Sequence, residues 1–328
     1  MKNYNLSKKK IQLKPIFKQK WPTGTRPKVT IICHAFNHEA YLGEAIKSFL
    51  MQETSFPVNI IIHDDCSSDK TVDIIKEYYN LHPEIIKPIY RKENLYTNKK
   101  SFTLDLYIEA DGDYIAYCDG DDFWTSSNKL QMQFETLEKF TDNIFCGHLT
   151  QNFVDMKLDQ PKYIDFKQIL NDKMIAHTSS FFFKNIFKPF LKNKDKLPEY
   201  MFYGFNGDYA LSVFLTQNSD CIVLPYKMSY YRIHNEGSFN SLKDNKGIIK
   251  KALSMLHINH QIKYFFGPEI YLNLSKKNLH YALSINKRNI LSLNFFGLIE
   301  SLMNFCLLLL EYISATILLR FHKKYKNK

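Results

Sequence analysis

Several features that mark other protein classes are missing from this chain of 328 residues. Its six cysteines form no C-x-x-C pair and several fall inside apolar runs, which argues against a zinc ribbon, a redox dithiol or a disulfide framework. No apolar segment of about 7 to 15 residues follows the charges of the first ten residues, so we expect no signal peptide. Both absences predict a cytoplasmic protein.

A basic face on the body of the protein is also missing, although the net charge is +11. Residues 1–28 hold nine Lys and Arg and no acid, and residues 320–328 hold five more. Subtracting these fourteen charges from +11 leaves −3 for residues 29–319. This distribution predicts no nucleic-acid partner and favours basic ends that meet the anionic surface of a membrane.

The longest apolar segment, residues 295–319, is interrupted by polar residues. Glu300, Asn304 and Glu311 are each costly at the centre of a bilayer. We therefore favour a helix that lies on the inner face of the cytoplasmic membrane over one that spans it. A helix packed on the main domain is the alternative.

Apolar runs alternate with helical periods from Lys28 onwards. This alternation predicts parallel strands joined by right-handed helical crossovers. The Lys-rich residues 1–27, with three prolines and Gly24, predict an irregular arm outside the core. We expect strands at 29–33, 58–63, 85–90 and 114–117, with helices at 41–52, 69–79 and 102–110 between them.

The second half of the sequence is less regular and ends in helical periodicity. We expect helices at 127–140 and 208–216, and strands at 144–153, 175–183 and 221–231. Beyond residue 245 the pattern is helical throughout. The predicted organisation is an α/β domain over residues 28–240 and a helical region over residues 241–328.

Acidic residues follow two of the predicted strands. Strand 114–117 runs into Asp119-Gly120-Asp121-Asp122, where neighbouring carboxylates repel one another unless a cation offsets them. Oxygen ligands favour Mn²⁺ or Mg²⁺, with phosphates completing the shell. Strand 58–63 ends in Asp64 and Asp65, which can accept hydrogen bonds from a nucleoside. At either place, a solvated turn that caps the next helix is the alternative.

Four motifs, in this order, resemble those of family 2 glycosyltransferases with the GT-A fold. They are Lys-Val-Thr-Ile-Ile-Cys-His-Ala-Phe-Asn-His-Glu at 28–39, Asp-Asp-x-Ser-x-Asp-x-Thr at 64–71, Asp-Gly-Asp-Asp at 119–122, and Gly-Asp-x-x-Leu at 207–211 with Tyr-Arg-x-His at 231–234. The last pair is similar to bacterial members that build surface polysaccharides. The resemblance implies a Rossmann-like mixed sheet flanked by helices, with a helical C-terminal extension.

The resemblance also implies a role for each matched residue. Five residues are implied to bind the nucleotide sugar: His34, Phe36, Asp65, Asp119 and Arg232. Asp121 and His234 are implied to hold the metal, and Asp208 to act as the catalytic base. The residues implied to contact the acceptor are His177, Thr178 and Ser179. His34 and Phe36 depart from the Thr or Ser and the Tyr that the family usually has at these positions.

The implied reaction moves a sugar, with inversion, from a nucleotide diphosphate donor to a glycan or lipid-linked acceptor. A UDP-sugar is the favoured donor. A sugar nucleotidyltransferase is one alternative, but its glycine-rich turn would follow the first strand, whereas Gly24 precedes Val29. A non-catalytic, membrane-associated scaffold on the same fold is the other.

Overall fold

The computed structural model describes residues 13–95, 103–171, 174–191, 196–202 and 207–234, and some helical residues between 262 and 316. The predicted helical region 241–328, including the segment 295–319, lies almost wholly outside the described residues. Within the described part of the chain, no helix is long and apolar enough to cross a membrane.

The chain divides into two compact units. The first comprises residues 1–94, 105–192 and 215–232, and the second comprises residues 95–104, 193–214 and 233–328. The sheet and the acidic turn belong to the first unit, whereas Asp208 and His234 belong to the second. Each unit is described by itself.

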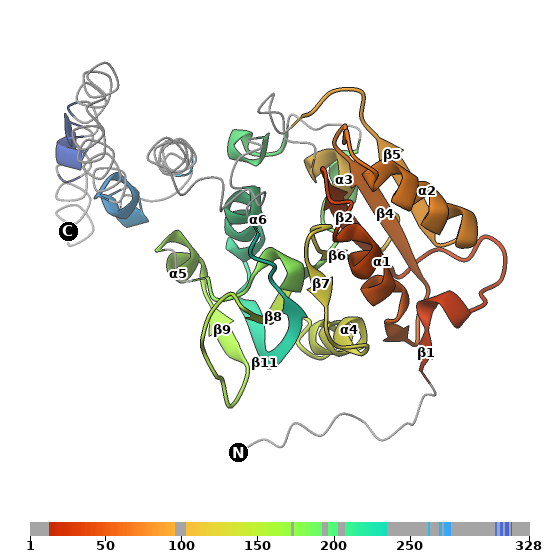
Figure 1. Cartoon of the computed structure of the whole chain (residues 1–328). Coiled ribbons are helices and arrows are strands. Elements are labelled where there is room, and N and C mark those ends of the chain that lie inside the picture. The colour runs from red at the N-terminus through yellow and green to blue at the C-terminus, as the bar shows by residue number, and fades with distance from the viewer. Residues whose placement is uncertain are drawn as a thin grey trace. The chain divides into compact units, whose positions relative to one another are not determined.

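Four of the predicted strands form the parallel half of the sheet. β2 (Val29–Ala35) lies between β4 (Val58–Asp64) and β6 (Tyr114–Tyr117), and β5 (Ile86–Tyr90) extends the sheet beyond β4. The predicted helices are α1 (Leu42–Leu50), α2 (Thr71–Leu81) and α3 (Thr103–Glu109). α1 and α2 lie side by side along the parallel strands (Figure 1). The predicted parallel arrangement is therefore confirmed.

The sheet continues in mixed directions through the second half of the sequence. β10 (Phe182–Lys184) runs antiparallel to β6 and to β8 (Phe145–Gln151). β11 (Cys221–Tyr230) runs parallel to β8 and pairs antiparallel with β7 (Phe123–Trp124) and β9 (Lys162–Ile164). The described residues thus form a nine-stranded sheet in the order β5-β4-β2-β6-β10-β8-β11-β7, with β9 on β11. Further helices are α4 (Lys129–Lys139), α5 (Phe166–Leu170) and α6 (Gly207–Thr216).

One predicted strand, 175–183, is largely wrong. A 3₁₀ turn, η2 (Thr178–Ser180), interrupts it, and the strand β10 begins only at Phe182. The side chain of His177 accepts a hydrogen bond from the backbone N–H of Ser179, and the N–H of Ser180 donates to the carbonyl of His177 at 2.8 Å. These local bonds compete with a strand ladder, which the apolar pattern alone does not reveal.

The two faces of the parallel strands have different surroundings, because successive side chains point to opposite faces. Ile31 and Cys33 of β2 belong to a buried core that also includes Ile46 and Phe49 of α1 and Leu130 of α4. The opposite face of β2 carries Thr30, Ile32 and His34, which are also buried. One face of the parallel strands therefore packs against the helices, and the other face carries the polar residues described below.

The sequence predicts that the N-terminal arm lies outside the core, but the structure places part of it in the core. β1 (Lys14–Pro15) pairs with β3 (Glu53–Thr54), and the short 3₁₀ turn η1 (Ile16–Lys18) follows it. Ile16 is 2 % exposed and belongs to the core. The burial of Ile16, together with the pairing of β1 and β3, holds this segment on the core.

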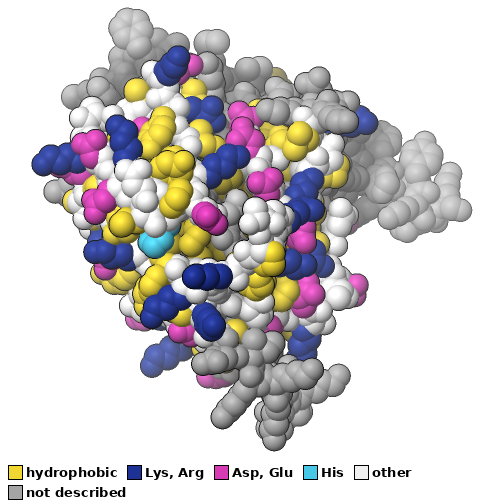
Figure 2. All heavy atoms as spheres, turned by 90° about the vertical axis from the view of Figure 1, so that its right-hand side faces the viewer, with side chains coloured by type: hydrophobic (Ala, Val, Ile, Leu, Met, Phe, Trp, Pro, Cys, Tyr) yellow, Lys and Arg dark blue, Asp and Glu magenta, His cyan; other side chains and the backbone are white. Residues whose placement is uncertain are grey.

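Charges of both signs share the surface around α2 and the N-terminal segment. Figure 2 shows basic and acidic side chains interspersed over this face of the described residues. The mixture agrees with the near-neutral charge of residues 29–319.

Candidate active site

The carboxyl ends of β2 and β4 place two buried histidines and an aspartate on one face of the sheet. The register pairs His34 with His63, and both are buried, at 8 % and 0 % exposed. Asp65 lies two residues beyond His63 and donates its backbone N–H to the carbonyl of Ala35. β2 ends at Ala35 and β4 ends at Asp64, so Phe36 and Asp65 directly follow the carboxyl ends of two paired parallel strands. Phe36 is 44 % exposed, so its ring is available for stacking.

β6 brings the acidic turn to the same face. Tyr117 lies opposite Ile32 of β2, and its ring lies 5.3 Å from that of His34. The Tyr117 hydroxyl donates to Asp119 at 2.7 Å. Burial, followed by the nearby Asp119, raises the pKa of Tyr117 well above its usual range, so the phenol stays a donor. The structure therefore brings together His34, Phe36, Asp65 and Asp119, four of the five residues expected to bind the nucleotide sugar.

The turns after β2 and β4 are locked to each other. Asn37 has a left-handed backbone with φ of 53°, which asparagine tolerates. Its N–H donates to Ser67 Oγ and its Oδ1 accepts from the N–H of Ser68, both at 2.9 Å. The N–H of His38 donates to Thr71 Oγ1 at 2.8 Å. The hydroxyl groups of the second motif thus shape the site.

Gly120 lets the acidic turn pack closely on β2. Its N–H donates to the carbonyl of His34 at 2.7 Å. A Cβ built on Gly120 would lie 3.0 Å from the same oxygen and 3.0 Å from Leu42 Cδ1. The site therefore requires glycine between Asp119 and Asp121.

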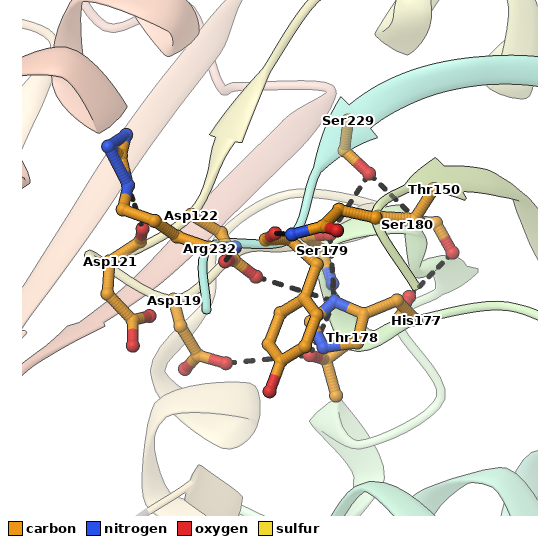
Figure 3. Close-up of polar contacts among 12 residues, drawn as sticks. Asp119, Asp121, Asp122, Thr150, His177, Thr178, Ser179, Ser180, Ser229 and Arg232 are labelled. Atoms are coloured by element: carbon orange, nitrogen blue, oxygen red, sulfur yellow. Dashed lines mark hydrogen bonds and ion pairs between the residues drawn. The ribbon is translucent and has the colours of Figure 1, made fainter. Parts of the chain in front are cut away.

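Arg232 holds the acidic turn from β11. Its backbone N–H donates to Asp122 Oδ1 at 2.9 Å, and its Nε donates to the carbonyl of Asp121 at 2.8 Å. A third bond joins its guanidinium to Glu44 Oε2 at 2.7 Å. Figure 3 shows Arg232 running alongside Asp121 and Asp122.

The guanidinium of Arg232 also lies over two aromatic rings. Its Cζ is 5.0 Å from the centroid of Tyr41 and 4.9 Å from that of Phe123, distances at which a cation is attracted to a ring face. The side chain is therefore fixed in a single place. Its expected contact with the nucleotide sugar remains a prediction, but its part in ordering the turn is visible.

His177 and its turn lie beside Asp122 of the acidic turn (Figure 3). His177 Nδ1 lies 3.4 Å from Asp122 Oδ2. Burial lowers the pKa of His177 to about 4, and burial, followed by Asp121, raises the pKa of Asp122 well above its usual range. Both shifts oppose a charged pair, so the contact is between a neutral imidazole and a neutral carboxyl group.

The residues expected to face the acceptor divide into two kinds. Thr178 Oγ1 lies 3.5 Å from Asp119, so it reaches the acidic turn. Ser179 is fully buried, and its hydroxyl donates to Ser229 Oγ at 3.0 Å. Because Ser179 offers no accessible side chain, we restrict the acceptor prediction to His177 and Thr178.

His38 is a site residue that the sequence analysis missed. Its Nε2 lies 3.8 Å from Asp121 Oδ2, and its side chain is 16 % exposed. The signal that could have found it is its place in the first motif, directly after Asn37. Its imidazole brings a nitrogen ligand or a hydrogen-bond donor to the carboxylate expected to hold the metal.

Two predicted residues belong to the second unit. Asp208 lies in the first turn of α6, as predicted, and Ser212 Oγ donates to its carbonyl at 2.7 Å. His234 follows β11 in the sequence. Their predicted roles, as base and as metal ligand, remain predictions.

The donor chemistry of the acidic turn fits a divalent cation that arrives with a ligand. Among the residues that the structure describes, no three His, Cys, Asp or Glu side chains converge as a complete metal site. Mg²⁺ and similar ions usually take one or two carboxylates from the protein and the remaining oxygens from phosphates and water. Asp121 with the nearby His38 suits that partial share.

A mixed sheet whose strand ends carry this acidic turn defines the GT-A class of nucleotide-sugar-binding folds. Residues 30–206, more than half of the chain, match the model of glycosyl transferase family 2, and the chain belongs to that family. The family and fold inferred from the four motifs are thereby confirmed.

Relatives in bacteria match a part of this chain. An uncharacterized protein of Mycobacterium tuberculosis is 38 % identical over 122 residues, covering 37 % of this chain and 34 % of the relative. The putative teichuronic acid biosynthesis glycosyltransferase TuaG of Bacillus subtilis is 35 % identical over 129 residues, covering 38 % and 48 %. The dTDP-rhamnosyl transferase RfbG of Shigella flexneri is 33 % identical over 141 residues, covering 39 % and 47 %. The chain thus spans about a third to a half of the length of these relatives.

Solved structures share the fold at low sequence identity. Residues 1–349 of Staphylococcus aureus TarS, in complex with UDP-GlcNAc, match with a TM-score of 0.52 and 14 % identity, covering 84 % of this chain and 89 % of that one. The mannosyltransferase PcManGT of Pyrobaculum calidifontis, in complex with GDP-Man and Mn²⁺, matches with a TM-score of 0.53 and 15 % identity, covering 98 % and 85 %.

Proposed function

We propose that this protein is an inverting glycosyltransferase that moves a sugar from a nucleotide diphosphate donor to a glycan or lipid-linked acceptor. The observation that carries the proposal is the place of His34, Asp65 and Asp119 at the carboxyl ends of the neighbouring parallel strands β2, β4 and β6, with Tyr117 joining His34 to Asp119. Nucleotides bind at this edge in open α/β sheets. The UDP, GDP and dTDP named for the similar proteins support a nucleotide-sugar donor, with a UDP-sugar as the first choice.

Each residue of the first unit has a distinct task in this proposal. Asp65 accepts a hydrogen bond from the base, Phe36 stacks on it, and Asp119 accepts from the ribose. Asp121, with His38 beside it, holds Mn²⁺ or Mg²⁺. When bound, the cation offsets the negative charge that grows on the leaving diphosphate. Arg232 keeps the backbone of the turn in place.

The proposed base is Asp208. Asp208 removes the proton from the acceptor hydroxyl as it attacks the anomeric carbon, which inverts the configuration in a single displacement. Its place in the first turn of α6 favours the ionised carboxylate, because the positive end of the helix faces it. His234 is the proposed additional metal ligand.

The proposed setting is bacterial surface polysaccharide synthesis at the inner face of the cytoplasmic membrane. The name of TuaG supports a role in polysaccharide synthesis. The basic ends of the sequence support contact with an anionic membrane surface. Removing residues 290–328 is expected to abolish co-sedimentation with anionic vesicles at low salt. Unchanged co-sedimentation would contradict the membrane proposal.

A panel of nucleotide sugars tests the activity. Wild type with Mn²⁺ is expected to release the nucleotide from one donor, and Asp121→Ala is expected to lose that release. Asp73→Ala is a matched control, because its side chain is 77 % exposed on α2. Failure of the wild type to bind or turn over any nucleotide sugar with Mn²⁺ or Mg²⁺ would favour the scaffold alternative.

The nucleotidyltransferase alternative finds less support. The turn after β2 is closed by Asn37, whose side chain and N–H are bonded to the following motif. Gly24 lies before β2, in a turn where the N–H of Thr25 donates to the carbonyl of Pro22. A phosphate-cradling glycine loop after the first strand is therefore missing from this described part of the chain.

A further inference from the structure

Three aromatic rings gather beside the acidic turn. The ring centroid of His177 lies 4.8 Å from that of Phe153 and 4.5 Å from that of Tyr231, and the rings of Phe153 and Tyr231 are 6.1 Å apart. The rings come from three separate segments, because Phe153 follows β8, His177 precedes η2 and Tyr231 follows β11. We call Phe153, His177 and Tyr231 the aromatic cluster.

Backbone contacts between the ends of β8 and β11 fix the place of Phe153. The N–H of Tyr231 donates to the carbonyl of Gln151 at 3.0 Å, and Asn152 Nδ2 donates to the carbonyl of Tyr231 at 3.0 Å. Asn152 has a left-handed backbone with φ of 64°, which asparagine tolerates. The chain is therefore held to the end of β11 by the residue directly before Phe153, and the ring of Phe153 stays beside that of Tyr231.

The aromatic cluster has a buried inner part and an open outer part. The side chain of His177 is 13 % exposed, whereas Phe153 is 40 % exposed. A phenylalanine gains free energy from burial, so a ring that is ordered by its neighbours and still exposed offers apolar surface to a ligand. Phe153 is the member of the cluster that a ligand reaches most readily.

The aromatic cluster adjoins the acidic turn on the side away from the proposed metal ligand. His177 Nδ1 lies 3.4 Å from Asp122 Oδ2, and Thr178 Oγ1 lies 3.5 Å from Asp119 Oδ2. Figure 3 draws Asp121 and His177 on opposite sides of Asp122. Inversion requires the acceptor to attack the anomeric carbon from the side opposite the leaving group. The diphosphate is proposed to lie at Asp121, so the side of His177 is left for the acceptor.

A sugar ring suits the chemistry of this surface. A pyranose has a face of C–H groups and a rim of hydroxyl groups. The C–H groups pack against the negative face of an aromatic ring, and polar groups around an apolar contact fix the orientation of the ligand. The hydroxyl of Thr178, the residue next to His177, provides such a polar group.

We infer that the aromatic cluster binds a pyranose ring of the acceptor glycan, with Phe153 stacked on the C–H face of that ring. His177 and Tyr231 pack against Phe153 and hold it in place. This inference rests on the proposed function, because it takes the protein to transfer a sugar to a glycan. Phe153 lies outside the four motifs, so the sequence analysis did not single it out.

Saturation-transfer-difference NMR with methyl glycosides of hexoses and N-acetylhexosamines tests the stacking without turnover. The protein is first saturated with Mn²⁺ and with whichever of UDP, GDP and dTDP binds it most tightly. Wild type is expected to transfer saturation to at least one glycoside, most strongly at the C–H protons of one ring face. Phe153→Leu is expected to weaken the binding of that glycoside by about threefold or more, and Phe153→Trp to keep it within about twofold.

Tyr163→Leu is the matched control. Tyr163 is 45 % exposed and pairs with Ile222, at the end of the β8–β11 ladder opposite to Gln151. Glycoside binding is expected to be unchanged in this variant. Undiminished binding by Phe153→Leu, or an equal loss in Tyr163→Leu, overturns the inference. Should Phe153→Leu not fold, nuclear Overhauser effects between the Phe153 ring and the glycoside in the wild type decide.

Nucleotide binding separates this inference from the proposed function. Phe153→Leu is expected to change the ratio of the affinities for the nucleotide sugar and its nucleoside diphosphate by less than about twofold. A loss confined to the nucleotide sugar would place the donor sugar on Phe153 and overturn the inference. If a nucleoside diphosphate binds to the wild type and no glycoside does, the inference alone fails. If no nucleoside diphosphate binds, the proposed function fails as well.

Discussion

The backbone N–H of Arg232 donates to Asp122 Oδ1 at 2.9 Å, joining residues that lie 110 positions apart in the sequence. With the bond from Arg232 Nε to the carbonyl of Asp121, it fixes the acidic turn against the end of β11. The backbone of the turn is therefore ordered by contacts within the protein.

Arg232→Met tests this ordering role. The substitution keeps the backbone bond to Asp122 but removes the guanidinium and its contact with the Asp121 carbonyl. We expect kcat/KM to fall about tenfold or more, with a higher Mn²⁺ concentration needed for half-maximal activity. Glu44→Gln should have a smaller effect, because Glu44 is 56 % exposed. Lys227→Met, at an exposed position of β11, serves as the control; an equal loss there would contradict the prediction.

The three carboxylates of the turn should differ in their sensitivity to substitution. Asp122 has a raised pKa from burial and from Asp121, so asparagine resembles its favoured neutral form and still accepts from Arg232. We expect Asp122→Asn to change the free energy of unfolding by less than about 1 kcal/mol, and Asp122→Ala to cost about 1–3 kcal/mol. Urea denaturation measures both.

Asp121→Asn should instead reduce activity by about a hundredfold or more with little loss of stability, because the Asp121 carboxylate is the proposed metal ligand. Donor hydrolysis at saturating Mn²⁺ measures the effect. Equal losses of activity in Asp121→Asn and Asp122→Asn would argue against separate roles.

The free energy of unfolding is expected to depend on pH because of Lys129. Its ammonium group is fully buried, 2.8 Å from Gln133 Oε1 and 4.0 Å from the centroid of the Trp124 ring. Burial lowers the pKa of Lys129 from 10.5 to about 7. The folded state therefore binds fewer protons than the unfolded state between these pH values, so this group favours folding increasingly as the pH rises.

Lys129→Met removes that dependence. The full shift corresponds to roughly 5 kcal/mol, all of which opposes folding below pH 7. We expect Lys129→Met to be more stable than wild type at pH 7, with the difference shrinking by about 1 kcal/mol per pH unit up to pH 9.5. Parallel urea titrations at three pH values decide; a constant difference would show that Lys129 does not titrate in this range.

Gly120→Ala should disturb the site more than the fold. The added Cβ would lie 3.0 Å from the carbonyl of His34, which belongs to a central strand and cannot retreat easily. We expect about 1–3 kcal/mol of destabilisation and a rise in KM for the donor. Gly43→Ala, where the nearest atom is 3.9 Å away, is the control. An unchanged KM in Gly120→Ala would contradict the close packing.

The local patterns of the sequence determined the parallel strands, their helices and the positions of the motifs. Strong apolar runs such as Val29–Ala35 and Val58–Asp64 leave one choice of structure, because both of their faces must be covered. Asp65, Asp119 and Asp121 could be proposed for the same reason: motifs that follow parallel strands must meet at one edge of the sheet.

Only the tertiary structure decided what lies between the motifs. The 3₁₀ turn at Thr178–Ser180 depends on one histidine side chain, and the burial of Ser179 depends on its partner in β11. Three further contacts join strands or turns that are distant in sequence: His38 with Asp121, Arg232 with Asp121, and His34 with His63. Such contacts follow from sheet order and register, which the sequence pattern of a single strand does not specify.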